Sequence, residues 1–362
     1  MKIITIVGAR PQFIKAAAVS REISKRPEIN EIIIHTGQHF DKNMSDVFFE
    51  EMQIPTPRYR LNINSLNHGA MTGRMLEGIE PVLLKEKPDY VLVYGDTNTT
   101  LAGALAAKKL HIRVVHIEAG LRSYNMKMPE EINRILTDRI SDILCCPTDK
   151  AIENLKREGF EHLPCQVVMT GDVMQDAAWY YREVSANKSN IMNELGLAGE
   201  DFLLCTIHRA ENTDDVGRLT NIVNALNEIA LELEVILPLH PRTKKIINSM
   251  NINHRTENLK LIDPVSYFDM IELLKYTRMV LTDSGGVQKE AFFFAKPCIT
   301  LRDETEWVEL VDKGFNRLAG AEKEKILNVY HEMKDEKIDF HVDLYGNGQA
   351  GKNIINTIKN HH

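Results

Sequence analysis

The sequence is poor in the features that mark several common classes of protein. It holds five cysteines in 362 residues, and no two of them have the C-x-x-C spacing of a thiolate metal site. No apolar run approaches the ~20 residues that cross a bilayer, and the stretch before Gly8 is too short for a signal peptide. The net charge is −7, so no basic surface for nucleic acid is expected. We therefore expect a cytoplasmic protein with buried, reduced thiols and no membrane, metal or nucleic-acid partner.

Sequence fingerprints of dinucleotide and triphosphate sites are missing as well. The two glycine-containing turns that follow predicted strands match neither G-x-G-x-x-G nor G-x-x-x-x-G-K-[ST]. The thirteen histidines include no H-E-x-x-H spacing that would support a metal site. This argues against dehydrogenases that use NAD, against P-loop NTPases and against zinc proteases.

Short β-branched runs alternate with longer helical patterns along most of the chain, and its length favours two domains over one. In the first series, we expect strands at 2–7, 31–35, 90–94, 113–117 and 143–146, and helices at 11–24, 41–52, 71–85, 99–109 and 129–140. In the second, we expect strands at 202–207, 235–239, 259–262, 279–281 and 297–301, and helices at 215–231, 241–250, 266–276 and 287–294. This is the doubly wound α/β pattern of parallel strands covered by helices.

The boundary between the two series falls near Thr170-Gly171-Asp172, where a further strand ends. We predict a first domain over 1–170 and a second over 171–349. A last helical run over 350–359 can pack on either domain. Because doubly wound folds bind ligands outside the carboxyl ends of their strands, we expect the ligand in a cleft between the two halves.

The first strand is followed by a turn that carries two cations. Arg10 ends this turn and Lys15 lies one turn into the next helix, so both can bracket one anion. A capping arginine and a solvated lysine are the ordinary alternative. The position directly after a first buried strand makes the two interpretations about equally good.

A second turn, 282–290, offers backbone amides instead. Ser284 can cap the following helix, while Gly285 and Gly286 let a phosphate approach its N-terminus. A plain tight turn is the alternative. Glu290, two helical turns further on, is within reach of ribose hydroxyls, although such a residue alone is more often a surface acid. The two turns together predict two half-sites for one diphosphate.

Three carboxylates follow or face the ends of predicted strands. Asp96 and Glu118 come directly after buried strands, and Glu130 opens the helix that follows Met128-Pro129. Capping explains each of them taken alone. Acids that converge on one crevice raise one another's pKa, which favours proton transfer.

His208 and Arg209 follow the first strand of the second series. A histidine in that place can bind phosphate or move a proton. Most of the other histidines must have structural or surface roles.

Five motifs appear in a specific order, and together they closely resemble the non-hydrolysing UDP-N-acetylglucosamine 2-epimerases. The resemblance covers the whole chain, from Met1 to the last helix. Its motifs lie at 8–15, 94–100, 116–122, 129–134 and 282–290.

The resemblance implies the GT-B architecture, in which two Rossmann-like doubly wound domains face a central cleft. It also implies that the C-terminal helix, 350–362, packs back on the first domain and that the protein is a homodimer. The implied reaction is reversible inversion at C2 of a UDP-linked 2-acetamido sugar, with UDP and the UDP-sugar as the partners and no cofactor. Matched by motif, the catalytic positions are Asp96, Glu118, Glu130 and His208, and the nucleotide-binding positions are Arg10, Lys15, Ser284, Gly285, Gly286 and Glu290.

The chemistry of this reaction agrees with the residues. No carbonyl lies beside the C2 proton, so its direct removal is prohibitive. Elimination solves the problem, because a carboxylate takes the C2 proton as UDP leaves C1, and UDP then adds back to the 2-acetamidoglucal. Such a route needs a base, a proton donor on the other face and stabilisation of the departing diphosphate.

Several departures from the family pattern point to one of its branches. Ala9 and Gln12 replace the usual threonine and glutamate, and the segment 208–212 carries one arginine, Arg209, where two are usual. Together with 71–75 and 302–307, these variants resemble the branch that acts on UDP-2,3-diacetamido-2,3-dideoxyglucuronate, an intermediate for surface polysaccharides. Since Gln12 removes a negative charge, we expect it and Arg209 to help bind a substrate with a C5 carboxylate.

Some members of the family also bind a second UDP-sugar as an activator. Gln38 and Arg74 fall at positions that resemble this site, whereas Asp41 replaces a second glutamine. Three rival functions remain at this point: UDP-N-acetylglucosamine 2-epimerase proper or a hydrolysing epimerase, a GT-B glycosyltransferase, and a non-catalytic UDP-sugar sensor.

Overall fold

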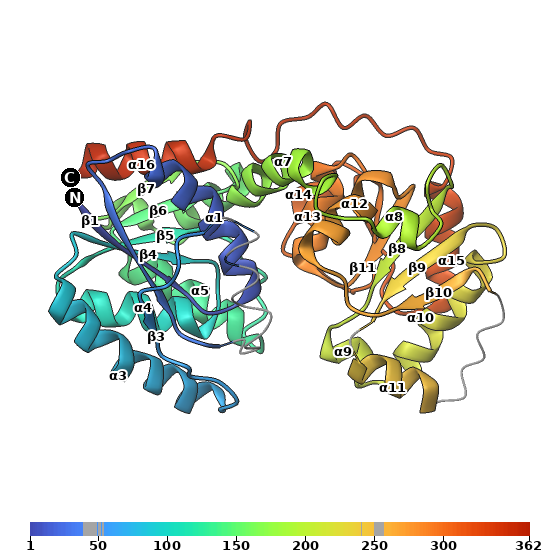
Figure 1. Ribbon diagram of the computed structural model, residues 1–362, viewed down its shortest axis with the longest axis horizontal. Helices are drawn as coiled ribbons and strands as arrows, with labels where there is room; N and C mark the ends of the chain where they lie inside the picture. The colour runs from blue at the N-terminus through green and yellow to red at the C-terminus, as the bar shows by residue number, and fades with distance from the viewer. Residues whose placement is uncertain (39–48, 50–51, 53, 240, 250–256) are drawn as a thin grey trace. The chain divides into compact units, whose positions relative to one another are not determined.

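Two compact α/β units make up the protein (Figure 1). The computed structural model describes residues 1–38, 49, 52, 54–239, 241–249 and 257–362. The first unit consists of residues 1–177 and 343–362, and the second of residues 178–342. Each unit is built on one sheet whose described ladders are all parallel, so the predicted α/β class is confirmed.

A seven-stranded sheet of order β3-β2-β1-β4-β5-β6-β7 forms the centre of the first unit. Its strands are β1 (Lys2–Val7), β2 (Asn30–His35), β3 (Tyr59–Arg60), β4 (Tyr90–Tyr94), β5 (Arg113–Ile117), β6 (Ile143–Cys146) and β7 (Gln166–Met169). The helices of this part of the chain are α1 (Arg10–Ser24), α3 (His68–Glu86), α4 (Asn98–Lys109), α5 (Pro129–Ile140), α6 (Asp149–Arg157), the 3-10 helix η1 (Phe160–His162), α7 (Val173–Ser185), which runs on into the second unit, and α16 (Ala350–His361).

The second unit contains a six-stranded sheet of order β10-β9-β8-β11-β12-β13. Its strands are β8 (Phe202–Thr206), β9 (Glu234–Pro238), β10 (Leu259–Ile262), β11 (Met279–Thr282), β12 (Cys298–Thr300) and β13 (Asn316–Leu318). Its helices are α8 (Ile191–Glu194), α9 (Ala210–Thr213), α10 (Val216–Ile229), α11 (Pro241–Ser249), α12 (Tyr267–Tyr276), α13 (Gly285–Phe293), α14 (Val308–Asp312) and α15 (Lys323–Met333).

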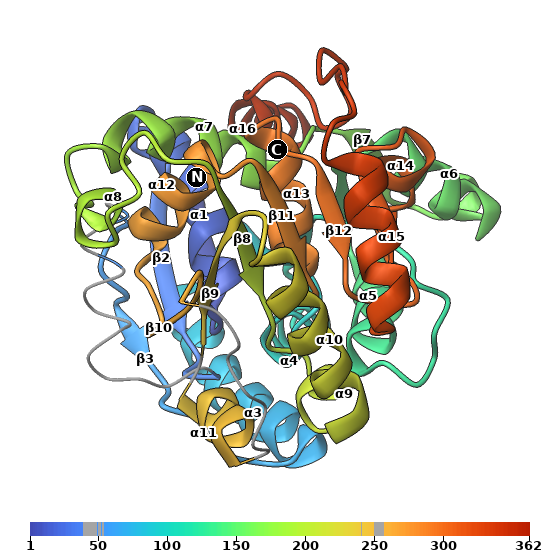
Figure 2. The same ribbon diagram turned by 90° about the vertical axis from the view of Figure 1, so that its right-hand side faces the viewer.

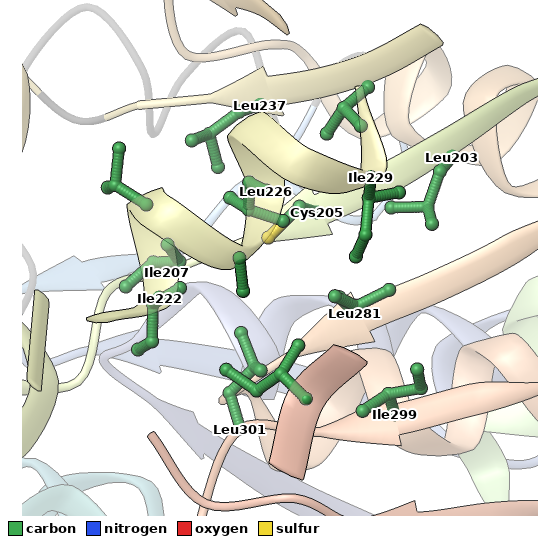
Figure 3. Close-up of a cluster of buried hydrophobic side chains, with 14 of the residues drawn as sticks. Leu203, Cys205, Ile207, Ile222, Leu226, Ile229, Leu237, Leu281, Ile299 and Leu301 are labelled. Carbon is green, nitrogen blue, oxygen red and sulfur yellow. The ribbon is translucent and has the colours of Figure 1, made fainter. Parts of the chain in front are cut away.

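Apolar side chains bury both faces of each sheet. In the second unit, Leu203 and Cys205 of β8 join a core cluster with α10, which packs beside α15 (Figures 2 and 3). Phe202 and Leu204 point to the opposite face, because side chains alternate along a strand, and they are equally buried. In the first unit, all five residues of β4 are fully buried. Burial on both faces explains why these strands appear in the sequence as continuous apolar runs.

Most of the predicted elements lie within a few residues of those observed. Sequence reasoning missed the short strands β3 and β13 at the sheet edges, and the helices α6 and α15. The predicted helix 41–52 falls almost entirely outside the described residues. No described helix is long and apolar enough to span a membrane.

Helix α16 packs against α1 in the first unit (Figure 1). Its first amides, those of Ala350 and Gly351, donate hydrogen bonds of 3.1 and 2.8 Å to the two carboxylate oxygens of Asp176. Burial raises the pKa of Asp176 to about 6, against the opposite effect of these two N–H donors. A Cβ on Gly351 would lie 2.9 Å from the carbonyl oxygen of Ala18, so the two helices meet at this glycine.

The side chain of Gln12 joins two turns at the carboxyl edge of this sheet. Its Oε1 accepts hydrogen bonds from the amides of Gly8 (2.8 Å) and Ala9 (3.1 Å). Its Nε2 donates to the carbonyl oxygen of Tyr94 (2.9 Å) and to Oγ1 of Thr100 (3.0 Å). Gln12 is only 1% exposed, and both ends of its amide are engaged within the protein. The contact with substrate that we expected of Gln12 therefore has no support in this geometry.

Substitution of Gly351 tests the packing of α16. Alanine usually stabilises a helix relative to glycine, by about 0.5–1 kcal/mol. We expect the reverse for Gly351→Ala, a loss of about 1–3 kcal/mol in the free energy of unfolding, because the new methyl group meets the backbone of α1. Gly73→Ala on α3 is the matched control, since a Cβ there has no neighbour within 4 Å. Urea unfolding measures both changes, and equal stabilisation by both variants would contradict the packing described.

Substitution of Gln12 by glutamate tests the bridge between the turns. A carboxylate cannot donate to the Tyr94 carbonyl oxygen, so we expect Gln12→Glu to cost about 1–3 kcal/mol of stability at neutral pH. The new acid would have a raised pKa in the folded state. The protonated acid would then stabilise the folded state fully below its pKa in the unfolded chain, about 4.3. This stabilisation would be lost as the pH rises through the pKa of the acid in the folded state. Urea midpoints across this pH range should diverge from those of the wild type, and parallel curves would refute the bridging role.

Candidate active site

Two of the predicted acids of the first unit, Asp96 and Glu118, follow neighbouring strands at one edge of its sheet. Strands β1, β4 and β5 are neighbours, and all of them run in the same direction. The turn after β4 carries Gly95 and Asp96, and Glu118 follows β5 directly. Parallel strands end at a common edge, which explains why residues far apart in the sequence come together here.

Lys15 and Glu118 form a buried ion pair at this edge. Lys15 Nζ lies 2.5 Å from Glu118 Oε1, and the two side chains are 11% and 8% exposed. A Cβ on Gly95 would lie 3.0 Å from the ammonium and 3.5 Å from the carboxylate oxygen. Gly95 has a φ of +64°, so glycine suits both the backbone and the crowding at this position. The pair brings a predicted phosphate ligand into contact with a predicted catalytic acid.

Glu118 adopts a backbone conformation that is rare for its residue type. Its φ is +71°, in the left-handed region that costs a non-glycine residue about 1–2 kcal/mol. The amides of Glu118 and Ala119 both donate to the carbonyl oxygen of Cys145, each over 3.1 Å. Local strain of this kind gathers at functional sites, where the surrounding structure holds it in place.

Asp96 is held by an arginine that sequence reasoning did not select. Arg134 on α5 donates from Nε (3.0 Å) and Nη2 (2.7 Å) to Asp96 Oδ2. Its Nη1 lies 2.5 Å from Glu131 Oε2. Asp96 keeps 29% of its side chain exposed, so it remains accessible to a ligand. Arg134 was visible as the last residue of the motif 129–134, three positions after Glu131.

Glu130 and Glu131 are neighbours in sequence with different surroundings. Glu131 is fully buried, and it accepts hydrogen bonds from the amides of Ser123 (3.0 Å) and Tyr124 (2.9 Å). It is therefore a structural acid that orders the loop before α5. Glu130 is half-buried in the first turn of α5 and forms no ion pair with any residue in the described part of the chain.

Three further predicted residues of the first unit are Arg10, Gln38 and Arg74. Arg10 is the first residue of α1 and is half-buried. Gln38 Oε1 accepts hydrogen bonds from the amide (3.1 Å) and the hydroxyl (2.9 Å) of Thr99, at the start of α4. Arg74 lies on α3 with 67% of its side chain exposed, 2.8 Å from Glu77 Oε2. Gln38 therefore supports the catalytic edge, whereas Arg74 lies on an open helix surface.

In the second unit, Asp283 organises the corresponding edge. This buried carboxylate accepts hydrogen bonds from the amides of His208 and Arg209, each over 3.1 Å, and from Asn212 Nδ2 over 3.1 Å. Burial alone would raise the pKa of Asp283, but the hydrogen bond and the charge of His208 outweigh it and lower the pKa. Asp283 lies in the motif 282–290, although sequence reasoning gave it no role.

His208 is oriented by this buried acid. Its Nδ1 lies 2.9 Å from Asp283 Oδ1, and its side chain is 55% exposed. Because Nδ1 faces the carboxylate, the other ring nitrogen is the one left to meet a ligand. The Nε of Arg209 is buried and has no hydrogen-bond partner among the described residues, which leaves a donor to be satisfied beside His208.

The two glycines that start α13 have different surroundings. Ser284 caps the helix by accepting a hydrogen bond from the Val287 amide (3.4 Å). A Cβ on Gly285 would collide with the carboxylate of Glu306, so a larger residue here would displace that side chain. Gly286 is exposed and has only Ser284 Oγ nearby, at 3.9 Å, so an anion can approach the helix N-terminus at this residue.

Glu290 lies on the same helix and is 6% exposed, so it is not the surface acid that was the alternative. Within the described ranges, no group of three or more histidine, cysteine or acidic side chains is arranged to hold a metal ion. The edge of the first unit offers carboxylates paired with cations, which suit proton transfer. The edge of the second unit offers a capped helix N-terminus and an oriented histidine, which suit an anion.

Comparison with known proteins agrees with this chemistry. The sequence profile of the family described as UDP-N-acetylglucosamine 2-epimerase matches residues 21–359. A Pseudomonas aeruginosa protein named UDP-2,3-diacetamido-2,3-dideoxy-D-glucuronate 2-epimerase is 57% identical over 98% of both chains. The UDP-N-acetylglucosamine 2-epimerase of Methanocaldococcus jannaschii is 45% identical, again over 98% of both chains.

Solved structures extend the likeness to the fold. The M. jannaschii enzyme in complex with UDP-GlcNAc and UDP has a TM-score of 0.91 at 44% identity, and the match covers 99% of this chain and 100% of that one. The Neisseria meningitidis UDP-GlcNAc 2-epimerase bound to UDP-GlcNAc has a TM-score of 0.89 at 33% identity, with the same coverage. The predicted GT-B fold class of two Rossmann-like domains is thus confirmed. With matches of this extent along its whole length, the chain belongs to the UDP-N-acetylglucosamine 2-epimerase family, whose named members are isomerases.

Proposed function

We propose that this enzyme epimerises UDP-2,3-diacetamido-2,3-dideoxyglucuronate reversibly at C2, giving the manno epimer for surface polysaccharide synthesis. The observation that carries the choice of substrate is the 57% identity to the P. aeruginosa protein named for it, over nearly the whole of both chains. The departures at Ala9 and around Arg209 point the same way. The main alternative substrate is UDP-N-acetylglucosamine, after which the 45% identical M. jannaschii relative is named.

The proposed route is elimination and re-addition. A carboxylate takes the C2 proton, the C2–H electrons form the C1=C2 bond, and the C1–O bond breaks so that UDP leaves with its electron pair. A proton then reaches C2 from the opposite face while a UDP oxygen attacks C1. No electron is gained or lost overall, so the route needs no NAD.

Asp96 and Glu118 are the acids that we assign to proton transfer in the first unit. Both follow neighbouring strands, and each is paired with a cation, Arg134 and Lys15 respectively. This pairing supports their presence as carboxylates, the form that accepts a proton. Glu130 is the third acid at this end, and its lack of an ion pair suits a group that changes its protonation state.

We assign UDP to the N-terminus of α13 in the second unit. Ser284 and the open approach at Gly286 support a diphosphate there, with Glu290 near the ribose. His208, oriented by Asp283, is suited to hold or protonate the departing phosphate. Arg209 brings a buried donor that still needs an acceptor.

We also assign Lys15 and Arg10, at the start of α1, to contact with the diphosphate of UDP. A diphosphate that reaches Lys15 competes with Glu118 for the same ammonium group. Binding of UDP would therefore weaken the hold on the Glu118 carboxylate and make it more basic. In this way Lys15 links the leaving group to the proton acceptor.

We also infer that the enzyme works as a homodimer. Four large apolar side chains of the first unit are exposed on α5 or in the loop before it, where a second copy can cover them. They are Tyr124, Met126, Ile132 and Leu136, with 65%, 60%, 40% and 46% of their surface exposed.

Incubation with a panel of UDP-sugars in deuterated water tests the proposed function. We expect deuterium at C2 of UDP-2,3-diacetamido-2,3-dideoxyglucuronate and of its epimer, with the UDP-sugar retained and slower exchange in UDP-N-acetylglucosamine. Faster exchange in UDP-N-acetylglucosamine would assign the enzyme to the alternative substrate. Net release of UDP would indicate a hydrolysing epimerase, transfer to an added acceptor a glycosyltransferase, and tight binding without exchange a sensor.

Isosteric amides test the catalytic acids. We expect Asp96→Asn and Glu118→Gln each to slow deuterium incorporation by about 10²–10⁴-fold, because an amide cannot take a proton from C2. Affinity for the UDP-sugar, measured by calorimetry, should change far less. Glu153→Gln on α6 is the matched control, since this acid is 57% exposed and lies far from the edge in sequence. Exchange at the wild-type rate in both site variants would remove these acids from the mechanism.

A further inference from the structure

A histidine and an aspartate with no exposed surface lie directly beneath the catalytic edge of the first unit. His116 is on β5, Asp138 is on α5, and both side chains are 0% exposed. His116 Nδ1 lies 2.6 Å from Asp138 Oδ1, and His116 Nε2 lies 2.7 Å from the carbonyl oxygen of Gly95. None of the roles assigned above uses this histidine.

The contacts of His116 determine its protonation state. A backbone carbonyl oxygen can only accept, so Nε2 must carry a proton. Asp138 Oδ2 already accepts hydrogen bonds from the Gly120 amide (3.2 Å) and from Arg122 Nη1 (2.7 Å), as an ionised carboxylate does. Nδ1 must then donate to Asp138 as well, which makes the His116 ring an imidazolium.

The charges around His116 balance one another inside the unit. Burial alone would raise the pKa of Asp138, but the charges of His116 and Arg122 outweigh it and lower the pKa. Arg122 is in turn paired with Glu158 at 2.7 Å. The thiols of Cys146 and Cys165 also interact with Asp138, and burial raises the pKa of both, so both stay neutral. Two cations and two anions are thus held together, and of these four side chains only that of Glu158 is partly exposed (28%).

This network fixes the turn that carries Asp96. The amide of Gly95 donates to the Ile117 carbonyl oxygen over 2.9 Å, and its own carbonyl oxygen accepts from His116. The amide and the carbonyl oxygen of Gly95 therefore both form hydrogen bonds with β5, the strand that leads into Glu118. Through Gly120, Asp138 also holds the loop that follows Glu118.

We propose that His116 is a positioning residue for the epimerase reaction. As a buried imidazolium it ties the turn bearing Asp96 to the strand and loop that bear Glu118, and so keeps the two catalytic acids at a fixed separation. This inference rests on the proposed function, because it takes these two residues as the proton-transferring acids.

Two amide variants separate the two hydrogen bonds of the ring. The amide nitrogen of asparagine replaces Nδ1, so His116→Asn keeps the bond to Asp138 and loses the bond to Gly95. The longer glutamine replaces Nε2, so His116→Gln keeps the bond to Gly95. Both variants remove the same charge, which makes each the matched control for the other.

We expect His116→Asn to lower kcat by about 100-fold with little change in KM, because a shift of about 1 Å in a catalytic group costs this much. His116→Gln should retain at least about 10-fold more activity than His116→Asn, as rescue of one hydrogen bond would give. Rates are divided by the folded fraction from circular dichroism. Equal kcat per folded molecule in the two variants, or wild-type kcat in folded His116→Asn, would overturn the proposal.

NMR of the wild-type enzyme gives a test that needs no variant and no substrate. The ¹⁵N and ¹H signals of the His116 ring should show one proton attached to each ring nitrogen, because both nitrogens face hydrogen-bond acceptors. A ring with a proton on only one nitrogen would overturn the inference even if the enzyme is an epimerase. Conversely, the absence of C2 exchange in every UDP-sugar of the panel would refute the proposed function and leave the ring signals unchanged.

Discussion

The buried ion pair between His116 and Asp138 is the constraint on which the catalytic edge of the first unit depends. Charges removed from water need partners on every side, so this pair fixes its neighbours as a group. It holds the Gly95 carbonyl on one side and the Gly120 amide on the other. Between these two contacts lies Glu118, in a left-handed conformation that it would not keep alone. The hydrophobic core forms the sheet, and this polar network determines where the acids at its edge are placed.

The second unit also contains a buried aspartate paired with a histidine. Asp283 is buried at the end of β11, and it collects the amides of His208 and Arg209 from the end of β8. In both units a buried aspartate is paired with a histidine. In the second unit the aspartate itself joins two strand ends, whereas in the first unit His116 makes the contact with the turn after β4. A second difference lies in exposure, since His116 is enclosed whereas His208 is 55% exposed. Enclosure suits a residue that positions others, and exposure suits one that meets a ligand.

Sequence reasoning found the strands and the acids because both leave local signals. Buried parallel strands appear as continuous apolar runs, and Asp96 and Glu118 come directly after two of them. The partners of these acids left no such signal. Arg134 pairs with Asp96 across 38 positions, and Gln12 donates to a carbonyl 82 positions away. Nothing local shows that Gly285 lies against Glu306, or that both ends of the Gln12 amide are engaged within the protein. Such facts depend on which strand ends become neighbours, and this is decided by topology.

The ion pair of Lys15 with Glu118 joins a residue that we assign to phosphate binding to one that we assign to proton transfer. A carboxylate bound by a lysine is a weak base, and a lysine bound by a carboxylate is a weak ligand for phosphate. In an elimination, the weak basicity of the carboxylate and the weak phosphate binding of the lysine are useful, because the base is needed only when a diphosphate is present to depart. Exchange of Lys15 from Glu118 to the diphosphate would strengthen the base and stabilise the leaving group at once. The Gly95 turn, which packs against both groups, keeps them close enough for this exchange. The proposed mechanism therefore needs both the rigidity that we assign to His116 and the mobility of Lys15.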